Sequence, residues 1–117
     1  MLNLRIVTTD ELQLSSRDGS TPGLRVLTLT GVLTISTLFA FQEFAHSDES
    51  GTLIVDMSGV TYIDSAGLGS LIAAYLGRER EERKLVLTSV NERVKTVMAV
   101  SGVQELFEMY PSIADAV

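Results

Sequence analysis

Two neighbouring side chains, Asp64 and Ser65, are the residues of this sequence best suited to chemistry, within the stretch "VTYIDSAGLGSLIAAYL". The serine nucleophile of many hydrolases occupies a G-x-S-x-G turn and needs a general base close by. Ile63 stands where that turn requires its first glycine, and the only histidine, His46, is predicted on a different helix. The spacing therefore argues against a serine hydrolase.

The glycines after Ser65 do not form a nucleotide-binding loop. Gly67 and Gly69 make half of a G-x-G-x-x-G pattern, but Ile72 occupies the third glycine position and both glycines lie inside the predicted helix. The chain has no P-loop, no cysteine and one histidine, which excludes thiolate zinc sites and multi-histidine metal sites. We therefore predict no catalytic residue, no metal, no cofactor and no enzymatic activity.

The simplest role for the aspartate–serine pair is structural. A side-chain oxygen of Asp64 or Ser65 could accept a free N–H group in the first turn of a helix, which stabilises a helix by about 1 kcal/mol. If Asp64 is the cap, Ser65 becomes the first helical residue and its hydroxyl is spare and exposed. The residues alone leave the structural role and a functional role open.

Strands and helices alternate along the chain, which predicts an α/β fold with a mostly parallel or mixed sheet covered by helices. Strands are predicted at Leu24–Thr30, Thr52–Asp56, Lys84–Ser89 and residues 106–110, with a hairpin strand near Glu11–Ser15. Helices are predicted from Ser36, from Ser65, after the N-cap Asn91 as far as Gly102, and briefly at residues 112–117.

The helix that begins at Ser65 has an apolar side and an uncharged side. The apolar residues recur at helical spacing and are expected to face the core: Leu68, Leu71, Ile72, Tyr75 and Leu76. The opposite side lacks the charges usual on an exposed helix face: Ala66, Ser70, Ala73 and Gly77. We predict that a partner protein docks there, with cover by another element of the chain as the alternative. The cluster Arg78–Lys84 alternates in sign, which is typical of a solvated helix end.

The composition is that of a folded globular protein, with 45% apolar and 21% charged residues in a chain of 117. A formal net charge of −6 with nine Lys and Arg residues argues against nucleic-acid binding, which depends on neutralising phosphates. No apolar run reaches the roughly 18 residues of a membrane span. The N-terminal "MLNLRIVTTDEL" also lacks the basic-then-apolar order of a signal peptide. We expect a cytoplasmic protein without direct membrane insertion.

The motif around Ser65 resembles the signature of the STAS-domain anti-sigma-factor antagonists, in which Asp-Ser-[Ser/Thr/Ala]-Gly-Leu-Gly opens a helix. The likeness covers nearly the whole chain: "LTLTGVL" resembles the second-strand motif, "TLIVDMSGV" the central strand and turn, "RVKTVMAVSGV" the third helix and "LFEMYPSIADAV" the tail. It implies one STAS domain over residues 1–117, with a four- or five-stranded mixed sheet and helices packed on one side. Residues 1–10 would form an extra strand or an N-terminal arm.

The resemblance also implies a switch. Ser65 would be phosphorylated by a partner that is both a serine kinase and an anti-sigma factor. The unphosphorylated form binds that partner and releases a sigma factor, and a phosphatase resets the cycle. The partner-binding residues implied in this way are Asp64, Ser65, Ala66, Gly67, Gly69, Ser70, Ala73 and Gly77.

The chain departs from the family at Thr34, where members often carry an aspartate after the Gly-x-[Leu/Ile/Val] of the second strand. Other proteins with this fold are scaffolds in stress-signalling complexes or small subunits of bacterial lipid transporters. The alternative prediction is therefore an accessory or scaffold subunit that has no phosphoryl switch.

Overall fold

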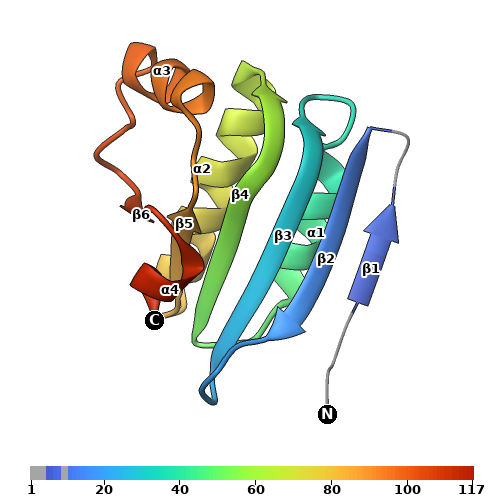
Figure 1. Cartoon of the computed structure of the whole chain (residues 1–117), viewed down its shortest axis with the longest axis vertical. Coiled ribbons are helices and arrows are strands. Elements are labelled where there is room, and N and C mark those ends of the chain that lie inside the picture. The colour runs from blue at the N-terminus through green and yellow to red at the C-terminus, as the bar shows by residue number, and fades with distance from the viewer. Residues whose placement is uncertain (1–4, 9–10) are drawn as a thin grey trace.

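A six-stranded sheet runs through the molecule and carries helices on its faces (Figure 1). The computed structural model describes residues 5–8 and 11–117. The strands lie side by side in chain order: β1 Arg5–Thr8, β2 Leu12–Asp18, β3 Leu24–Leu33, β4 Thr52–Ile63, β5 Lys84–Thr88 and β6 Glu108–Tyr110. The pairs β1–β2 and β2–β3 are antiparallel, whereas the three pairs from β3 to β6 are parallel. The predicted α/β class with a mixed sheet is confirmed.

The sheet has one strand more than the larger number predicted, because β1 adds to one edge. This strand falls within residues 1–10, for which the sequence left a strand or an arm open. Residues 1–4 and 9–10 of that segment lie outside the described residues. The strands predicted from Leu24, Thr52 and Lys84 are all present at those positions.

Strand β4 continues well past Asp56, where the sequence predicted a turn. The Asp56 Oδ1 atom accepts a hydrogen bond from the Ser58 backbone N–H at 3.0 Å, and the register with β3 shifts opposite this point. A Cβ atom on Gly59 would lie 2.9 Å from the Leu29 carbonyl oxygen, so only glycine fits this close approach without a shift. The irregularity is absorbed as a bulge, which carries β4 on to Ile63 and delivers Ser65 at the end of the sheet.

Three helices share one face of the sheet: α1 Leu38–Ser47, α2 Ser65–Arg80 and α3 Glu92–Val100. The main hydrophobic core lies between these helices and the sheet, and β5 contributes Leu85 and Leu87 to it. Successive side chains of a strand point to opposite faces, so Val86 belongs to a second, small cluster with Val26 and Ile54.

The short helix α4, Ile113–Ala116, lies on the other face of the sheet (Figure 1). Ile113 and Ala116 pack there against the small apolar cluster of the sheet. The prediction that the helices pack on one side is therefore correct for α1, α2 and α3 and wrong for α4. Among the described residues, no helix is both long enough and apolar enough to cross a membrane.

Candidate functional site

Helix α2 begins immediately after β4, and Asp64 fixes that junction. Its Oδ1 atom accepts a hydrogen bond from the Gly67 backbone N–H at 2.7 Å. Its Oδ2 atom accepts one from the Ile35 N–H at 3.1 Å, and its carbonyl oxygen accepts one from the Leu68 N–H at 2.9 Å. Of the two caps that the sequence left open, Asp64 and Ser65, the structure has Asp64, and the same carboxylate ties the loop after β3 to the start of α2.

Ser65 is the first residue of α2 and is exposed. Within the described part of the chain, its hydroxyl makes no hydrogen bond, because the capping position is already filled by Asp64. The N–H groups of the first helical turn have no acceptor inside the helix, and the Asp64 side chain occupies only that of Gly67. The backbone N–H groups of Ser65 and Ala66 therefore lie beside the Ser65 hydroxyl, which makes no hydrogen bond, at an exposed end of the helix.

Two glycines of the same motif have different surroundings. A Cβ atom on Gly67 would lie 2.0 Å from the Leu33 carbonyl oxygen, so Gly67 lets α2 approach the end of β3. A Cβ atom on Gly69 would meet nothing within 4 Å. Packing inside the molecule therefore requires Gly67 but gives no reason for Gly69, which is exposed on α2.

The predicted uncharged side of α2 is not one exposed face. Ser70 is only 2% exposed and its hydroxyl donates a hydrogen bond to the Gly67 carbonyl oxygen at 2.6 Å. Ala66 packs partly against the main core. Helix α1 lies beside α2 (Figure 1), so this side is covered in part by another element of the chain, which is the alternative that the sequence left open. The residues of α2 that are exposed before its charged end are Ser65, Gly69, Ala73 and Leu76.

The placement of the predicted apolar side is mostly correct. Leu68 and Leu71 are buried in the main core, and Ile72 and Tyr75 pack partly against it. Leu76 is 41% exposed and does not reach that core. The helical period correctly places Leu76 at the edge of the apolar side of α2. Only the packing of the molecule shows that this edge is exposed to solvent.

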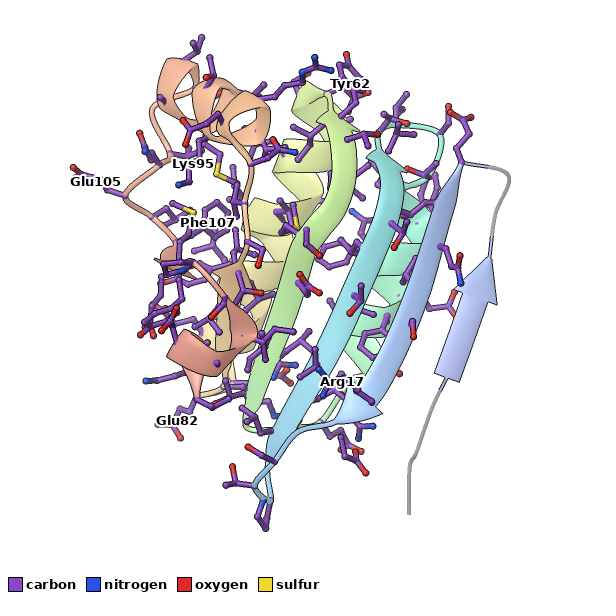
Figure 2. All side chains as sticks on the ribbon, viewed as in Figure 1. Arg17, Tyr62, Glu82, Lys95, Glu105 and Phe107 are labelled. Carbon is purple, nitrogen blue, oxygen red and sulfur yellow. The ribbon has the colours of Figure 1, made fainter. Side chains whose placement is uncertain are left out.

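Three large apolar side chains are exposed at the Ser65 end of the sheet, and sequence reasoning missed them. Ile35 is 61% exposed in the loop after β3, Phe39 is 69% exposed in the first turn of α1, and Tyr62 is 49% exposed near the end of β4. Figure 2 shows Tyr62 projecting from this end of the molecule, opposite to the end that carries Glu82. The sequence did contain an indication of this exposed apolar surface. The run "LTISTLF", which begins at the last residue of β3, is richer in apolar residues than is usual for a solvent-exposed loop.

Thr34 lies in the same loop, at the position where members of the resembled family often carry an aspartate. Its hydroxyl accepts a hydrogen bond from the Ser36 N–H at 3.2 Å, and its own N–H donates to the Thr37 hydroxyl at 2.9 Å. The Thr34 carbonyl oxygen accepts hydrogen bonds from the Thr37 and Leu38 N–H groups. Thr34 thus builds the turn into α1 and places no charge beside Ser65.

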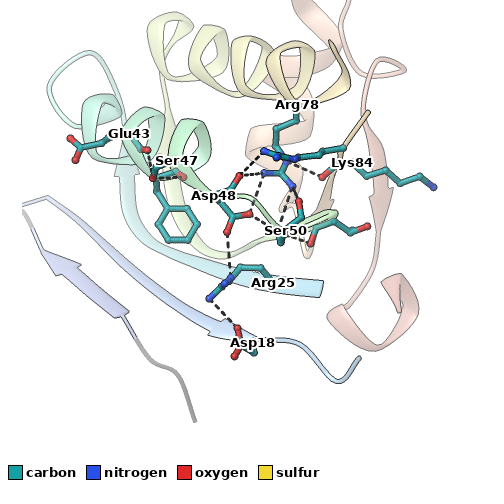
Figure 3. Close-up of polar contacts among 11 residues, drawn as sticks. Asp18, Arg25, Glu43, Ser47, Asp48, Ser50, Arg78 and Lys84 are labelled. Atoms are coloured by element: carbon teal, nitrogen blue, oxygen red, sulfur yellow. Dashed lines mark hydrogen bonds and ion pairs between the residues drawn. The ribbon is translucent and has the colours of Figure 1, made fainter. Parts of the chain in front are cut away.

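The other end of α2 holds a buried ion pair (Figure 3). The Arg78 guanidinium is 3% exposed and donates to the carbonyl oxygens of Lys84 at 3.0 Å, Asp48 at 3.1 Å and Ser50 at 2.6 Å. It also contacts the Asp48 carboxylate at 3.2 Å, and that carboxylate lies 3.4 Å from Arg25. Burial lowers the pKa of the Arg78 guanidinium, while the charge of Asp48 opposes this shift.

This pair corrects the prediction that the whole cluster Arg78–Lys84 is a solvated helix end. Arg78 points inward because α1 ends beside α2 and places Asp48, with its carbonyl and carboxylate oxygens, against the guanidinium. Arg83 contacts the Glu81 carboxylate at 3.6 Å and also donates to the Asp48 carbonyl oxygen at 3.4 Å. The cluster therefore combines one buried arginine, one partly buried arginine and charged residues that remain at the surface.

His46, the one histidine of the sequence, lies far from Ser65. His46 lies in the last turn of α1, whereas Ile35, just before α1, is the residue that contacts Asp64. A helix of this length spans about 15 Å, so His46 is too remote to act as a base for Ser65. The described residues contain no group of His, Cys, Asp and Glu that could hold a metal ion.

Comparison with known proteins gives both a family and curated relatives. The family model described as "Mlab, STAS domain" matches residues 16–109. The anti-sigma-B factor antagonist of Listeria monocytogenes is 28% identical over 61 residues, which are 52% of this chain and 54% of that protein. The chain thus spans about half the length of the curated relatives it matches.

Solved structures share the fold. An anti-sigma factor antagonist from Mycobacterium paratuberculosis aligns with a TM-score of 0.69 and 21% identity, over 99% of this chain and 91% of that chain. The murine anion transporter Solute Carrier 26 family member A9, in its inward-facing state, aligns with a TM-score of 0.73 and 26% identity. That alignment covers 84% of this chain but 18% of the transporter, so the fold also occurs as a small part of a much larger protein.

Proposed function

Since this chain belongs to the STAS domain family, we propose that it is an anti-sigma-factor antagonist, which binds an anti-sigma factor in the cytoplasm and thereby releases a sigma factor. The observation that carries the proposal is the free, exposed hydroxyl of Ser65 at the start of a helix already capped by Asp64. Curated relatives named as anti-sigma-B factor antagonists support the same function.

The proposed switch is phosphorylation of Ser65 by the anti-sigma factor acting as a serine kinase, with a phosphatase to reverse it. A phosphoryl group adds about −1.5 to −2 charges, which the helix N-terminus and its free N–H groups tolerate within this protein. The same charge, directly beside the Asp64 carboxylate, is costly to desolvate under a partner. Phosphorylation should therefore preserve the fold and weaken binding.

The proposed docking face is the Ser65 end of the molecule, made of Ile35, Phe39, Ser65, Gly69 and Ala73. Ile35 and Phe39 supply apolar area for a partner, and Asp64 holds the loop of Ile35 against α2. Gly69 costs about 1 kcal/mol of helix propensity relative to alanine, although nothing inside the molecule needs it. Close approach of a partner's backbone would account for this glycine.

The test is to incubate the purified protein with ATP and the anti-sigma factor kinase of the same organism, and to map the modified residue by mass spectrometry. The expected result is a single phosphoryl group on the peptide that carries Ser65, absent from the Ser65→Ala variant. Labelling of Thr61, or of Ser70, would contradict the assignment. Ser70 serves as an internal control because its hydroxyl is buried and already donates a hydrogen bond.

A second candidate is an accessory or scaffold subunit without a phosphoryl switch. It is favoured by the occurrence of the fold as a small part of an anion transporter. Purification of the tagged protein from its own cells separates the two. An ATPase of the histidine-kinase type as partner supports the switch, whereas transporter subunits support the second candidate.

A further inference from the structure

A groove of about 530 Å³ runs between α1 and α2 on the helix face of the molecule, towards the end of α2 that is remote from Ser65. Small residues line much of the groove, among them Ala45, Ala73 and Gly77. The charged and titratable residues of the lining are His46, Arg78, Arg80 and Glu81, and the charge of Arg78 is paired with Asp48. The groove meets the proposed docking face at Ala73.

The uncompensated charge at this groove is positive. The Arg80 guanidinium lies close to Gly77, with Nη2 3.8 Å from the position of a Cβ atom on that glycine. Neither Arg80 nor His46 makes an ion pair or hydrogen bond within the part of the chain that the structure describes. The Glu81 carboxylate is engaged by Arg83 at 3.6 Å. Arg80 is thus an unpaired positive side chain beside small residues, in a chain whose formal net charge is −6.

We propose that this groove receives a helix of the anti-sigma factor, with an Asp or Glu side chain of that helix paired to Arg80; this proposal rests on the proposed function. The small residues of the lining let a helix backbone approach closely, because interhelical distance depends on the side chains at the contact. A carboxylate over Arg80 gives a charge-assisted hydrogen bond with the guanidinium. The occupant is thereby defined as an acidic helix.

The groove and the switch are separate anchors for one partner. Ser65 and Arg80 lie at opposite ends of α2, about 22 Å apart at the helical rise. Substitutions at such a distance usually contribute independently. Phosphorylation of Ser65 should then weaken one end of the contact while the Arg80 pair continues to hold the other, which would set how much affinity the switch removes.

The test measures the affinity of the purified anti-sigma factor for the wild type and for four variants by titration calorimetry. Arg80→Glu should bind about tenfold more weakly, because it places like charges together, and Arg80→Lys should remain within about threefold of the wild type. Arg93→Glu makes the same change of net charge at an exposed position on α3 and should bind like the wild type. Arg80→Gln, which removes the charge without reversing it, gives the same comparison should Arg80→Glu melt early.

Ser65→Asp separates this proposal from the proposed function. If Ser65→Asp weakens binding and Arg80→Glu does not, the groove assignment is wrong and the switch stands. If the wild type binds no anti-sigma factor, both are wrong. If both variants weaken binding, the double variant should show the product of the two fold-changes. A wild-type dimer in sedimentation that Arg80→Glu dissociates would overturn the proposal, because the groove would then hold a second copy of this chain.

Discussion

Each end of α2 carries a charged side chain that bridges separate elements, but the two ends differ in whether a neighbouring polar group is left without a hydrogen bond. At the far end, Arg78 donates to three carbonyl oxygens and to Asp48, and none of its guanidinium is left for solvent or partner. At the near end, Asp64 satisfies two backbone N–H groups and leaves the adjacent Ser65 hydroxyl free. A polar group whose bonds are complete inside the molecule stabilises the fold, whereas a group left over at a well-anchored position is available for regulation.

The largest effect is expected at Arg78. Arg78→Met should reduce the free energy of unfolding by about 3–5 kcal/mol, because the buried Asp48 carboxylate and three carbonyl oxygens would lose the guanidinium that donates to them. Chemical denaturation measures the loss. The matched control is Arg80→Met, two residues on and exposed, which should stay within about 0.5 kcal/mol of the wild type. Equal losses at both positions would remove the distinction between the two ends.

The next effect separates the two glycines beside Ser65. Gly67→Ala should cost about 1–3 kcal/mol of unfolding free energy, because its Cβ atom would collide with the Leu33 carbonyl oxygen. Gly69→Ala should instead gain up to about 1 kcal/mol from helix propensity, since nothing obstructs its Cβ atom. In thermal melts, the melting temperature should fall for Gly67→Ala and rise for Gly69→Ala. A destabilised Gly69→Ala would mean that Gly69 serves internal packing.

A smaller effect is expected at the cap. Asp64→Ala should cost about 0.5–2 kcal/mol, because the Gly67 N–H loses its acceptor and the Ile35 loop loses its link to α2. Asp64→Asn keeps one acceptor oxygen and should lose less. Urea denaturation of both variants measures the difference. An unchanged stability for Asp64→Ala would show that neither bond contributes.

Local signals in the sequence predicted elements and caps well. Asn91 does cap α3, its side chain accepting from the Val94 N–H at 2.9 Å, and Gly102 does follow that helix with a positive φ of 73°. Such features depend on a few consecutive residues and their backbone preferences. The same kind of signal narrowed the cap of α2 to Asp64 or Ser65 and indicated a spare Ser65 hydroxyl if Asp64 is the cap, as the structure has it.

What the sequence did not predict depends on contacts between distant segments. Ser70 reads as a small polar residue on an open face, but it is buried in the structure, where α1 packs beside α2. Arg78 reads as one of several surface charges, and only the position of Asp48, thirty residues earlier in the chain, draws it inward. The exposure of Ile35 and Phe39 likewise depends on what does not pack over them. No periodic pattern within one helix contains this information.

The smallest effect on stability is expected at Ala73, where binding should respond instead. Ala73→Glu and Ala73→Arg should each change the unfolding free energy by no more than about 0.5 kcal/mol, since Ala73 is exposed. Both should abolish binding of the anti-sigma factor, because an unpaired charge would be buried in the interface. Circular dichroism melts measure the stability of each variant, and titration calorimetry measures its affinity for the anti-sigma factor. Unfolding of either variant would show that this position is internal, and normal binding by both would place the interface elsewhere.

The most direct measurement is the affinity of the anti-sigma factor for Ser65→Ala and Ser65→Asp, taken together with their melting temperatures. We predict that both variants melt like the wild type, since Ser65 makes no hydrogen bond within the described residues and a carboxylate suits a helix N-terminus. We also predict that Ser65→Ala binds like the wild type and that Ser65→Asp binds about tenfold or more weakly, a difference of about 1.4 kcal/mol. Equal affinity of the two variants, with both folded, would contradict the proposal that charge at Ser65 controls binding.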